Sequence, residues 1–149
     1  MKRLILSTAL TVFLPLSWAD TTPSEVSPAI QTLADRLLAD VSELLSVPKP
    51  AIVPPVRAAT LDYLRSRYCP GANCAIAAIY DMSTGEIYIL DSIRLDHPVY
   101  MSILVHELVH HLQYTYNWYH DLGDCEQWAN REEQAYNLQS QWLIARGGR

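Results

Sequence analysis

Hydrophobic and polar positions recur along the chain with two different periods, and each period predicts a kind of element. Apolar residues return every three or four positions over residues 29–45, which predicts an amphipathic helix. The same spacing predicts three further helices, over residues 57–68, 98–116 and 125–146. Residues 74–80 form a β-type run and residues 86–90 alternate apolar and polar side chains. The turn-forming Ser83, Thr84 and Gly85 lie between these two runs, so together they predict a hairpin.

The order of these elements predicts an α+β fold. A length of 149 residues is typical of one domain. Four prolines between residues 47 and 55 exclude a helix there and favour an extended edge segment over residues 51–53. We therefore expect a single compact domain over residues 29–149, with helices packed on a small, mostly antiparallel sheet.

The first 19 residues have the composition of a cleavable secretory signal. Lys2 and Arg3 precede an uncharged, mostly apolar stretch over residues 4–16, and Ser17 and Ala19 are the small residues that a signal peptidase reads. The apolar stretch is shorter than the roughly 20 residues that span a bilayer. Cleavage is expected after Ala19, with an uncleaved anchor as the alternative. Residues 20–28, rich in Pro, Ser and Thr, are predicted to form a flexible leader.

Composition and charge narrow the class of protein. Half of the residues are hydrophobic and 18% are charged, which excludes a disordered chain. The net charge is −5, without a cluster of Lys and Arg, which argues against a nucleic-acid partner and against a polybasic membrane anchor. Loss of Lys2 and Arg3 from the 11 basic residues, against 16 acidic ones, makes the mature net charge −7. We expect a secreted or periplasmic protein without a stable membrane anchor.

The three cysteines, Cys69, Cys74 and Cys125, all follow the predicted signal. An exported protein meets an oxidising compartment, where a disulfide is expected. The turn-forming residues between Cys69 and Cys74 favour a local bridge, which would leave Cys125 as a free buried thiol. Three cysteines allow three single bridges, so the other two pairings remain open.

The segment His106-Glu107-Leu108-Val109-His110 has the pattern H-E-x-x-H. Histidines at i and i+4 lie about 40° apart around a helix, so both imidazoles can serve one tetrahedral zinc ion. Glu107, rotated by about 100°, would lie beside the metal as a general base. A chance match to so short a pattern is the alternative. Against it, the apolar residues of this helix gather on the opposite face: Met101, Leu104, Val105, Leu108, Val109, Leu112 and Tyr116.

Glu132 in the last predicted helix is the candidate third ligand. A helical projection places it in the middle of the inward face, whereas Glu133 falls on the polar side. A carboxylate on an apolar face is costly unless it is paired or bound to a metal. We therefore predict that Glu132 binds zinc, with an ion pair to an arginine as the alternative. The inward face consists of Trp128, Ala135, Tyr136, Trp142 and Leu143.

Together these motifs resemble the gluzincin class of zinc metallopeptidases, in particular the compact minigluzincins. The segment Arg131-Glu132-Glu133-Gln134-Ala135-Tyr136 is similar to the R-E-x-x-A-D segment of small gluzincins. The resemblance covers residues 57–146 and implies one zinc ion held by His106, His110 and Glu132, with Glu107 as the catalytic base. Tyr136 departs from the pattern, because the family has there an Asp that orients a ligand histidine.

Other side chains near the motif are weaker candidates. His111 is rotated away from His106 and is predicted to be a polar residue on the side of the helix. Tyr119 and His120 could stabilise a tetrahedral oxyanion or could be plain surface groups. The resemblance implies that residues 86–90 hold an extended peptide along a sheet edge; an ordinary core strand is the alternative.

The predicted function is zinc-dependent hydrolysis of peptide bonds in an exported peptide or protein substrate. The alternative is an exported structural or interaction module that binds a metal without turnover, because a short chain leaves little room for a substrate-binding subdomain. Glu107 favours the enzyme, since a structural zinc needs no base and usually has a fourth protein ligand.

Overall fold

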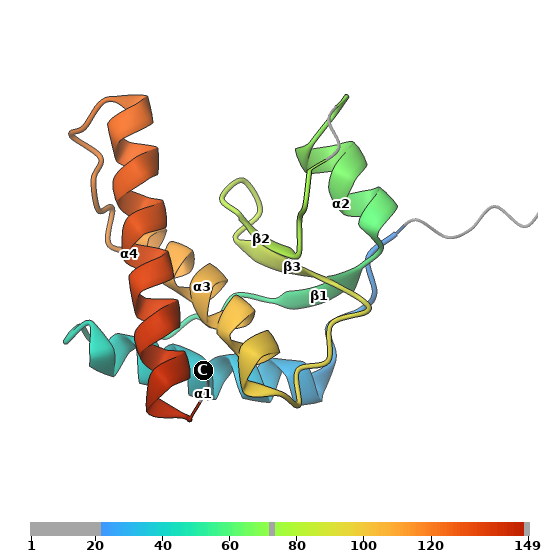
Figure 1. The fold of residues 1–149 in the computed structure, drawn as a ribbon, viewed down its shortest axis with the longest axis horizontal. Coiled ribbons are helices and arrows are strands. Elements are labelled where there is room, and N and C mark those ends of the chain that lie inside the picture. Colours follow the sequence, from blue (N-terminus) through green and yellow to red (C-terminus); the bar gives the residue numbers. More distant parts are fainter. Residues whose placement is uncertain (1–21, 72–73, 148–149) are drawn as a thin grey trace, which may run out of the picture.

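The computed structural model describes residues 22–71 and 74–147, which form four helices and three strands (Figure 1). The predicted signal peptide lies outside the described residues. The elements are α1 (Pro28–Leu44), β1 (Val56–Ala59), α2 (Leu61–Tyr68), β2 (Ala78–Asp81), β3 (Glu86–Leu90), α3 (Pro98–Thr115) and α4 (Asp124–Ala145). The predicted α+β class is confirmed, and the predicted helices over residues 29–45, 98–116 and 125–146 match α1, α3 and α4.

The three strands form a mixed sheet in the order β1-β3-β2. β2 and β3 are the predicted antiparallel hairpin, and β1 pairs with β3 in parallel. The extended edge segment predicted over residues 51–53 is not part of the sheet, whose edge strand is β1 instead. The helical prediction for the first residues of 57–68 is wrong, because they belong to β1. Pairing begins only after the last proline, where the N–H of Ile87 donates to the carbonyl of Pro55. Thr60 then starts α2 by accepting a hydrogen bond from the N–H of Tyr63.

The central strand β3 sends its side chains alternately to two hydrophobic clusters. Ile87 and Ile89 are buried in the main core with α1 and α3. Tyr88 faces the other side, where it packs with Leu64 of α2. The sheet is therefore covered by α1 and α3 on one face and by α2 on the other.

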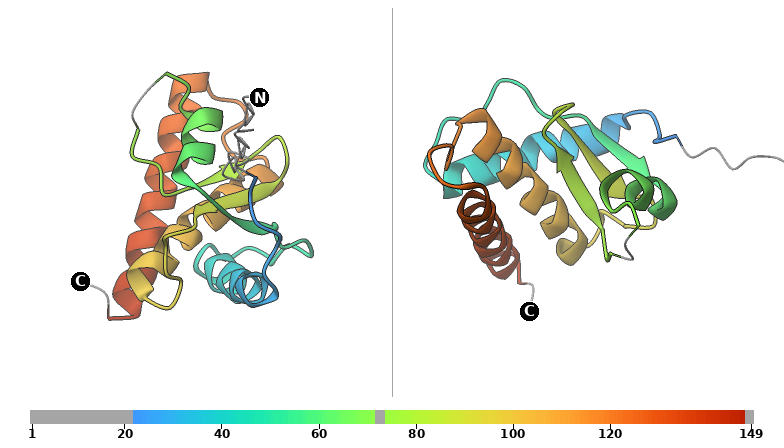
Figure 2. Two further views of the ribbon diagram at one scale, coloured as in Figure 1. Left: turned by 90° about the vertical axis from the view of Figure 1, so that its right-hand side faces the viewer. Right: turned by 90° about the horizontal axis from the view of Figure 1, so that it is seen from above.

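Helix α3 lies between α4 and the sheet, with α1 also packed against it (Figures 1 and 2). The predicted apolar face of α3 is confirmed, since Leu104, Val105, Leu108, Val109 and Leu112 are fully buried. The end of α4 is held against α1, because Asp40 accepts a hydrogen bond from Nε1 of Trp142 and pairs with Arg146. These contacts fix α4 alongside α3, which positions the candidate site.

The predicted disulfide between Cys69 and Cys74 is present. Cys125 is free, but the prediction that its thiol is buried is wrong, because Cys125 lies exposed at the start of α4. A disulfide is typical of proteins in oxidising compartments. None of the helices in the described ranges combines the length and the apolar character needed to cross a membrane.

Candidate metal centre

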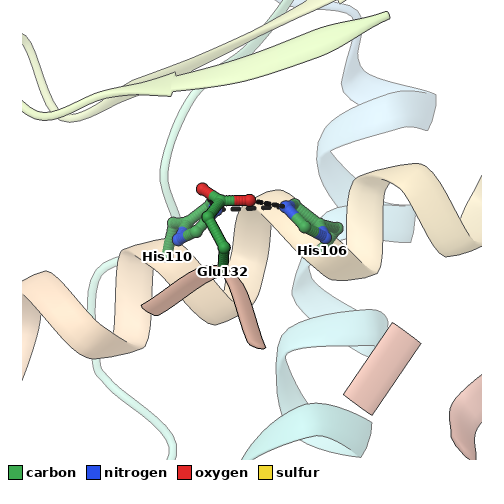
Figure 3. Close-up of side chains that lie close together, drawn as sticks. All are labelled: His106, His110 and Glu132. Carbon is green, nitrogen blue, oxygen red and sulfur yellow. Dashed lines mark hydrogen bonds and ion pairs between the residues drawn. The ribbon is translucent and has the colours of Figure 1, made fainter. Parts of the chain in front are cut away.

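Three side chains from two helices converge on one point: His106 and His110 of α3 and Glu132 of α4 (Figure 3). The two carboxylate oxygens of Glu132 lie 3.5 Å from Nε2 of His106 and 3.3 Å from Nε2 of His110. The two Nε2 atoms are 3.1 Å apart. All three ligand atoms lie within 4.8 Å of one another, so the group can hold a metal ion.

The hydrogen-bond partner of His106 fixes which of its ring nitrogens carries the proton. Nδ1 of His106 lies 3.2 Å from Oε1 of Gln139, whose Nε2 donates to Oγ of Ser102. That hydroxyl gives its own proton to the carbonyl of Val99, so it must accept from Gln139. Oε1 of Gln139 therefore accepts the proton of Nδ1, and Nε2 of His106 keeps its lone pair.

Gln113 accepts a hydrogen bond from Nδ1 of His110, as Gln139 does from Nδ1 of His106. Its Nε2 donates to the backbone carbonyl of Arg131, which can only accept, at 2.9 Å. Its Oε1 then faces Nδ1 of His110 at 2.8 Å and accepts the proton there. In the neutral form of each ring, Nε2 therefore carries the lone pair and faces the site, which is the form in which an imidazole binds a metal.

The arrangement suits a cation. Two imidazole lone pairs and a carboxylate would repel one another at these distances unless a positive charge lay between them. Burial, followed by the proximity of His110, lowers the pKa of His106 to about 4, so that the ring of His106 is neutral at neutral pH. Two imidazole nitrogens and a carboxylate oxygen form a donor set that fits a transition-metal ion.

Gln139→Leu tests whether Gln139 orients the ring of His106 for metal binding. Loss of the acceptor for Nδ1 should free the His106 ring to rotate or change tautomer, and zinc affinity should fall by about 10- to 100-fold. Zinc affinity would be measured by competition with a chromogenic chelator. Gln141→Leu, at an exposed position of the same helix, is the matched control and should leave the affinity unchanged. Equal affinities of the two variants would show that Gln139 does not orient the ligand.

Glu107 lies beside the triad and is almost completely buried, at 6% exposure. Its Oε2 accepts a hydrogen bond of 2.7 Å from the backbone N–H of Tyr80 in β2. The pKa of Glu107 is raised to about 8. Burial is the main cause and the nearby carboxylate of Glu132 adds to it, whereas the hydrogen bond from the Tyr80 N–H lowers the pKa. A cation held by the triad would favour the ionised form, because an opposite charge stabilises a carboxylate.

The triad and Glu107 line a groove of about 620 Å³. Its walls are the segment around β2, α3 at the base and one stripe of α4. Trp128 and Tyr136 belong to this stripe and are 65% and 60% exposed, so the prediction that they face inward to the core is wrong. Ala135 and Trp142 are buried as predicted, and Glu133 is exposed. The face of α4 that carries Glu132 therefore overlooks the groove rather than the core.

The orienting role that the resemblance assigns to position 136 is filled by Gln113 and Gln139. The ring of Tyr136 packs on that of His106, with centroids 4.5 Å apart. Neither glutamine is among the site residues predicted from the sequence. Gln113 follows His110 by three positions on the same helix, which could have revealed it. Gln139 follows Glu132 by seven positions, two turns along the same face.

The weaker candidates lie away from the triad. His111 is buried and contacts both the segment before β1 and strand β2. Its Nε2 lies 3.2 Å from the carbonyl of Ile52, and its Nδ1 lies 3.4 Å from the hydroxyl of Tyr80. Tyr119 and His120 are not among the side chains that line the groove. The strand expected to hold a peptide along the sheet edge, over residues 86–90, is instead the central strand β3. The edge strand that lines the groove is β2.

Fold and site together define a small α+β domain with a His-His-Glu group that can hold a metal ion. Residues 24–148 match the family described as "Domain of unknown function (DUF6647)", and the chain belongs to that family. No curated protein and no solved structure matches the chain. The family description assigns no activity, so a function must be argued from the site.

Proposed function

We propose that this protein is an exported zinc-dependent peptidase. One observation carries the proposal. The groove brings together a His-His-Glu group, whose two Nδ1 atoms are bound by glutamine oxygens, and a buried carboxylate that is not part of that group. A purely structural metal site would not need Glu107. Two histidines and one glutamate leave a coordination position open on a tetrahedral metal, which is typical of catalytic zinc.

His106, His110 and Glu132 would hold the ion. Bound there, zinc would supply a Lewis acid that polarises a carbonyl group and makes water more acidic. Glu107 is then the proton carrier: its carboxylate would accept a proton from the attacking water and deliver it to the leaving amine. The bond from the Tyr80 N–H holds one oxygen of Glu107 in place, which leaves the other oxygen for the proton.

The groove wall supports a peptide as the substrate. β2 is paired on one side by β3, and its other edge is not paired within the described residues. The N–H of Tyr80 points away from β3 to Glu107, so this free edge runs directly past the proposed base. An extended peptide can add to such an edge through main-chain hydrogen bonds, which would bring its carbonyl groups close to the triad.

One observation favours a second candidate, a structural metal site without turnover. The triad takes its ligands from α3 and α4, so a bound ion would also cross-link these two helices.

The test is to incubate the zinc-loaded protein with casein and with a broad peptide library, and to follow unfolding with and without a chelator. We expect cleavage that stops on chelation and returns with added zinc. Unfolding on chelation without any cleavage would favour the structural module instead.

A further inference from the structure

Arg131 lines the groove, and its guanidinium has no oxygen partner among the described residues. It is half-buried on α4, directly before Glu132, and lines the groove. Its Nη1 lies 3.8 Å from Sδ of Met82, the residue that follows β2. Its Nε is buried and has no hydrogen-bond partner. None of the ion pairs found over residues 22–71 and 74–147 includes Arg131.

This lack of partners is unusual in the molecule. Among buried side-chain nitrogen and oxygen atoms of the described residues, only Nε of Arg131 and Oγ of Ser42 lack a hydrogen bond. Buried donors without acceptors are costly, and a thioether is only a weak acceptor. Ser42 lies on α1, whereas Arg131 is at the groove. The guanidinium is therefore the group whose hydrogen bonds the protein itself leaves incomplete beside the proposed site.

Although Glu107, Asp124 and Glu132 also line the groove, the immediate surroundings of Arg131 would strengthen its pairing with an anion. Among the described residues that line the groove, Arg131 is the only arginine or lysine. The carbonyl of Arg131 is bound to Gln113, which orients His110, so Arg131 lies at the His110 end of the triad. Met82 and Trp128 are exposed apolar side chains in the same groove. Apolar neighbours reduce the screening of a charge by water, which strengthens its pairing with an anion.

We propose that Arg131 binds a carboxylate of the substrate and thereby selects peptides that carry one at the His110 end of the groove. The planar guanidinium matches the two oxygens of a carboxylate better than any other side chain does. The proposal rests on the proposed function in one respect, namely that the groove binds peptides. The carboxylate can be the C-terminal group of the peptide or the side chain of an Asp or Glu residue.

Binding, rather than cleavage, tests the proposal. The parent probe is an acetylated heptapeptide of alanine with a central leucine. In one series, a single alanine is replaced by Glu or by Gln, one position at a time. In a second pair, the parent peptide has either a free or an amidated C-terminus. Their affinities are measured by calorimetry on the zinc-loaded Glu107→Gln variant, which should not cleave them. We expect Glu at one position, or the free C-terminus, to bind about 10- to 100-fold more tightly than its neutral counterpart. The pair of charged and neutral probes that differ in affinity identifies the source of the carboxylate.

A second substitution assigns this preference to Arg131. Arg131→Gln in the same background should abolish the difference between charged and neutral probes, and Arg131→Lys should restore part of it, because the charge returns without the planar group. Arg36→Gln, an exposed arginine of α1, changes the net charge equally and should leave the preference intact. Equal affinities for all pairs, no binding of any probe, or a preference that survives Arg131→Gln would each overturn the proposal.

Catalytic measurements separate this proposal from the proposed function. In an otherwise wild-type protein, a carboxylate anchor predicts that Arg131→Gln raises KM for the preferred peptide and leaves kcat nearly unchanged. A fall in kcat for charged and neutral peptides alike would make Arg131 a stabiliser of the transition state and overturn the anchor. If the wild-type protein binds the charged probes selectively but cleaves none, the anchor stands and the hydrolytic function fails.

Discussion

Glu107→Gln is expected to lower peptide hydrolysis by about 10²- to 10⁴-fold while zinc stays bound. The amide keeps the size of the side chain but cannot accept the proton from water. Because Glu107 is not one of the three converging side chains, its loss should leave the ligand set intact. The measurement is kcat on a cleaved library peptide, together with zinc content by atomic emission on the same sample.

A matched control for this variant is Glu133→Gln, which makes the same chemical change at an exposed position of α4. It should retain the wild-type rate. The Glu107 variant also replaces an acceptor of the Tyr80 N–H, but the amide oxygen of Gln can still accept this hydrogen bond, so little unfolding is expected. Wild-type turnover by Glu107→Gln at full zinc occupancy would exclude Glu107 as the base.

Glu132→Gln is expected to remove zinc from the protein. The substitution replaces the anionic ligand by a weak neutral one and leaves only His106 and His110 to hold the ion. Zinc affinity should fall by more than the roughly 10- to 100-fold expected when a residue that only orients a ligand is removed. Zinc stoichiometry after dialysis against a weak chelator measures this effect, and hydrolysis should disappear with the metal.

Glu133→Gln again provides the comparison, now between adjacent glutamates on one helix. Glu133 is exposed, so its substitution should change the free energy of unfolding by no more than about 0.5 kcal/mol and should leave zinc in place. Retention of zinc by Glu132→Gln and loss by Glu133→Gln would mean that the ligand is Glu133, one residue further along α4.

Features that depend on local spacing could be predicted from the sequence. The i, i+4 geometry of a helix by itself sets His106 and His110 on one face, and the same periodicity separates Glu132 from Glu133. The hairpin of β2 and β3 and the bridge between Cys69 and Cys74 likewise join residues that are close along the chain. In each case, the local backbone geometry already limits where the side chains can lie.

Features that depend on contacts between distant segments required the tertiary structure. The parallel pairing of β1 with β3 joins residues about 30 positions apart, so the pattern around Val56–Ala59 did not reveal a strand. A helical projection shows which residues share a face but not what that face meets. Trp128 and Tyr136 were therefore placed in the core although they line the groove.

The sequence by itself determined the three longest helices, the hairpin and which side chains of α3 and α4 could act together at a metal. Only the tertiary structure decided that Gln113 and Gln139 bind the Nδ1 atoms of the two histidines. It also decided that Arg131 lines the groove without an acidic partner in the part of the chain that the structure describes. The physical reason is that hydrogen bonds and burial depend on positions in three dimensions. The periodicity of a sequence tells only in which direction a side chain points from its own helix or strand. Gln139 lies 33 residues from His106, and only the packing of α3 against α4 brings the two side chains into contact.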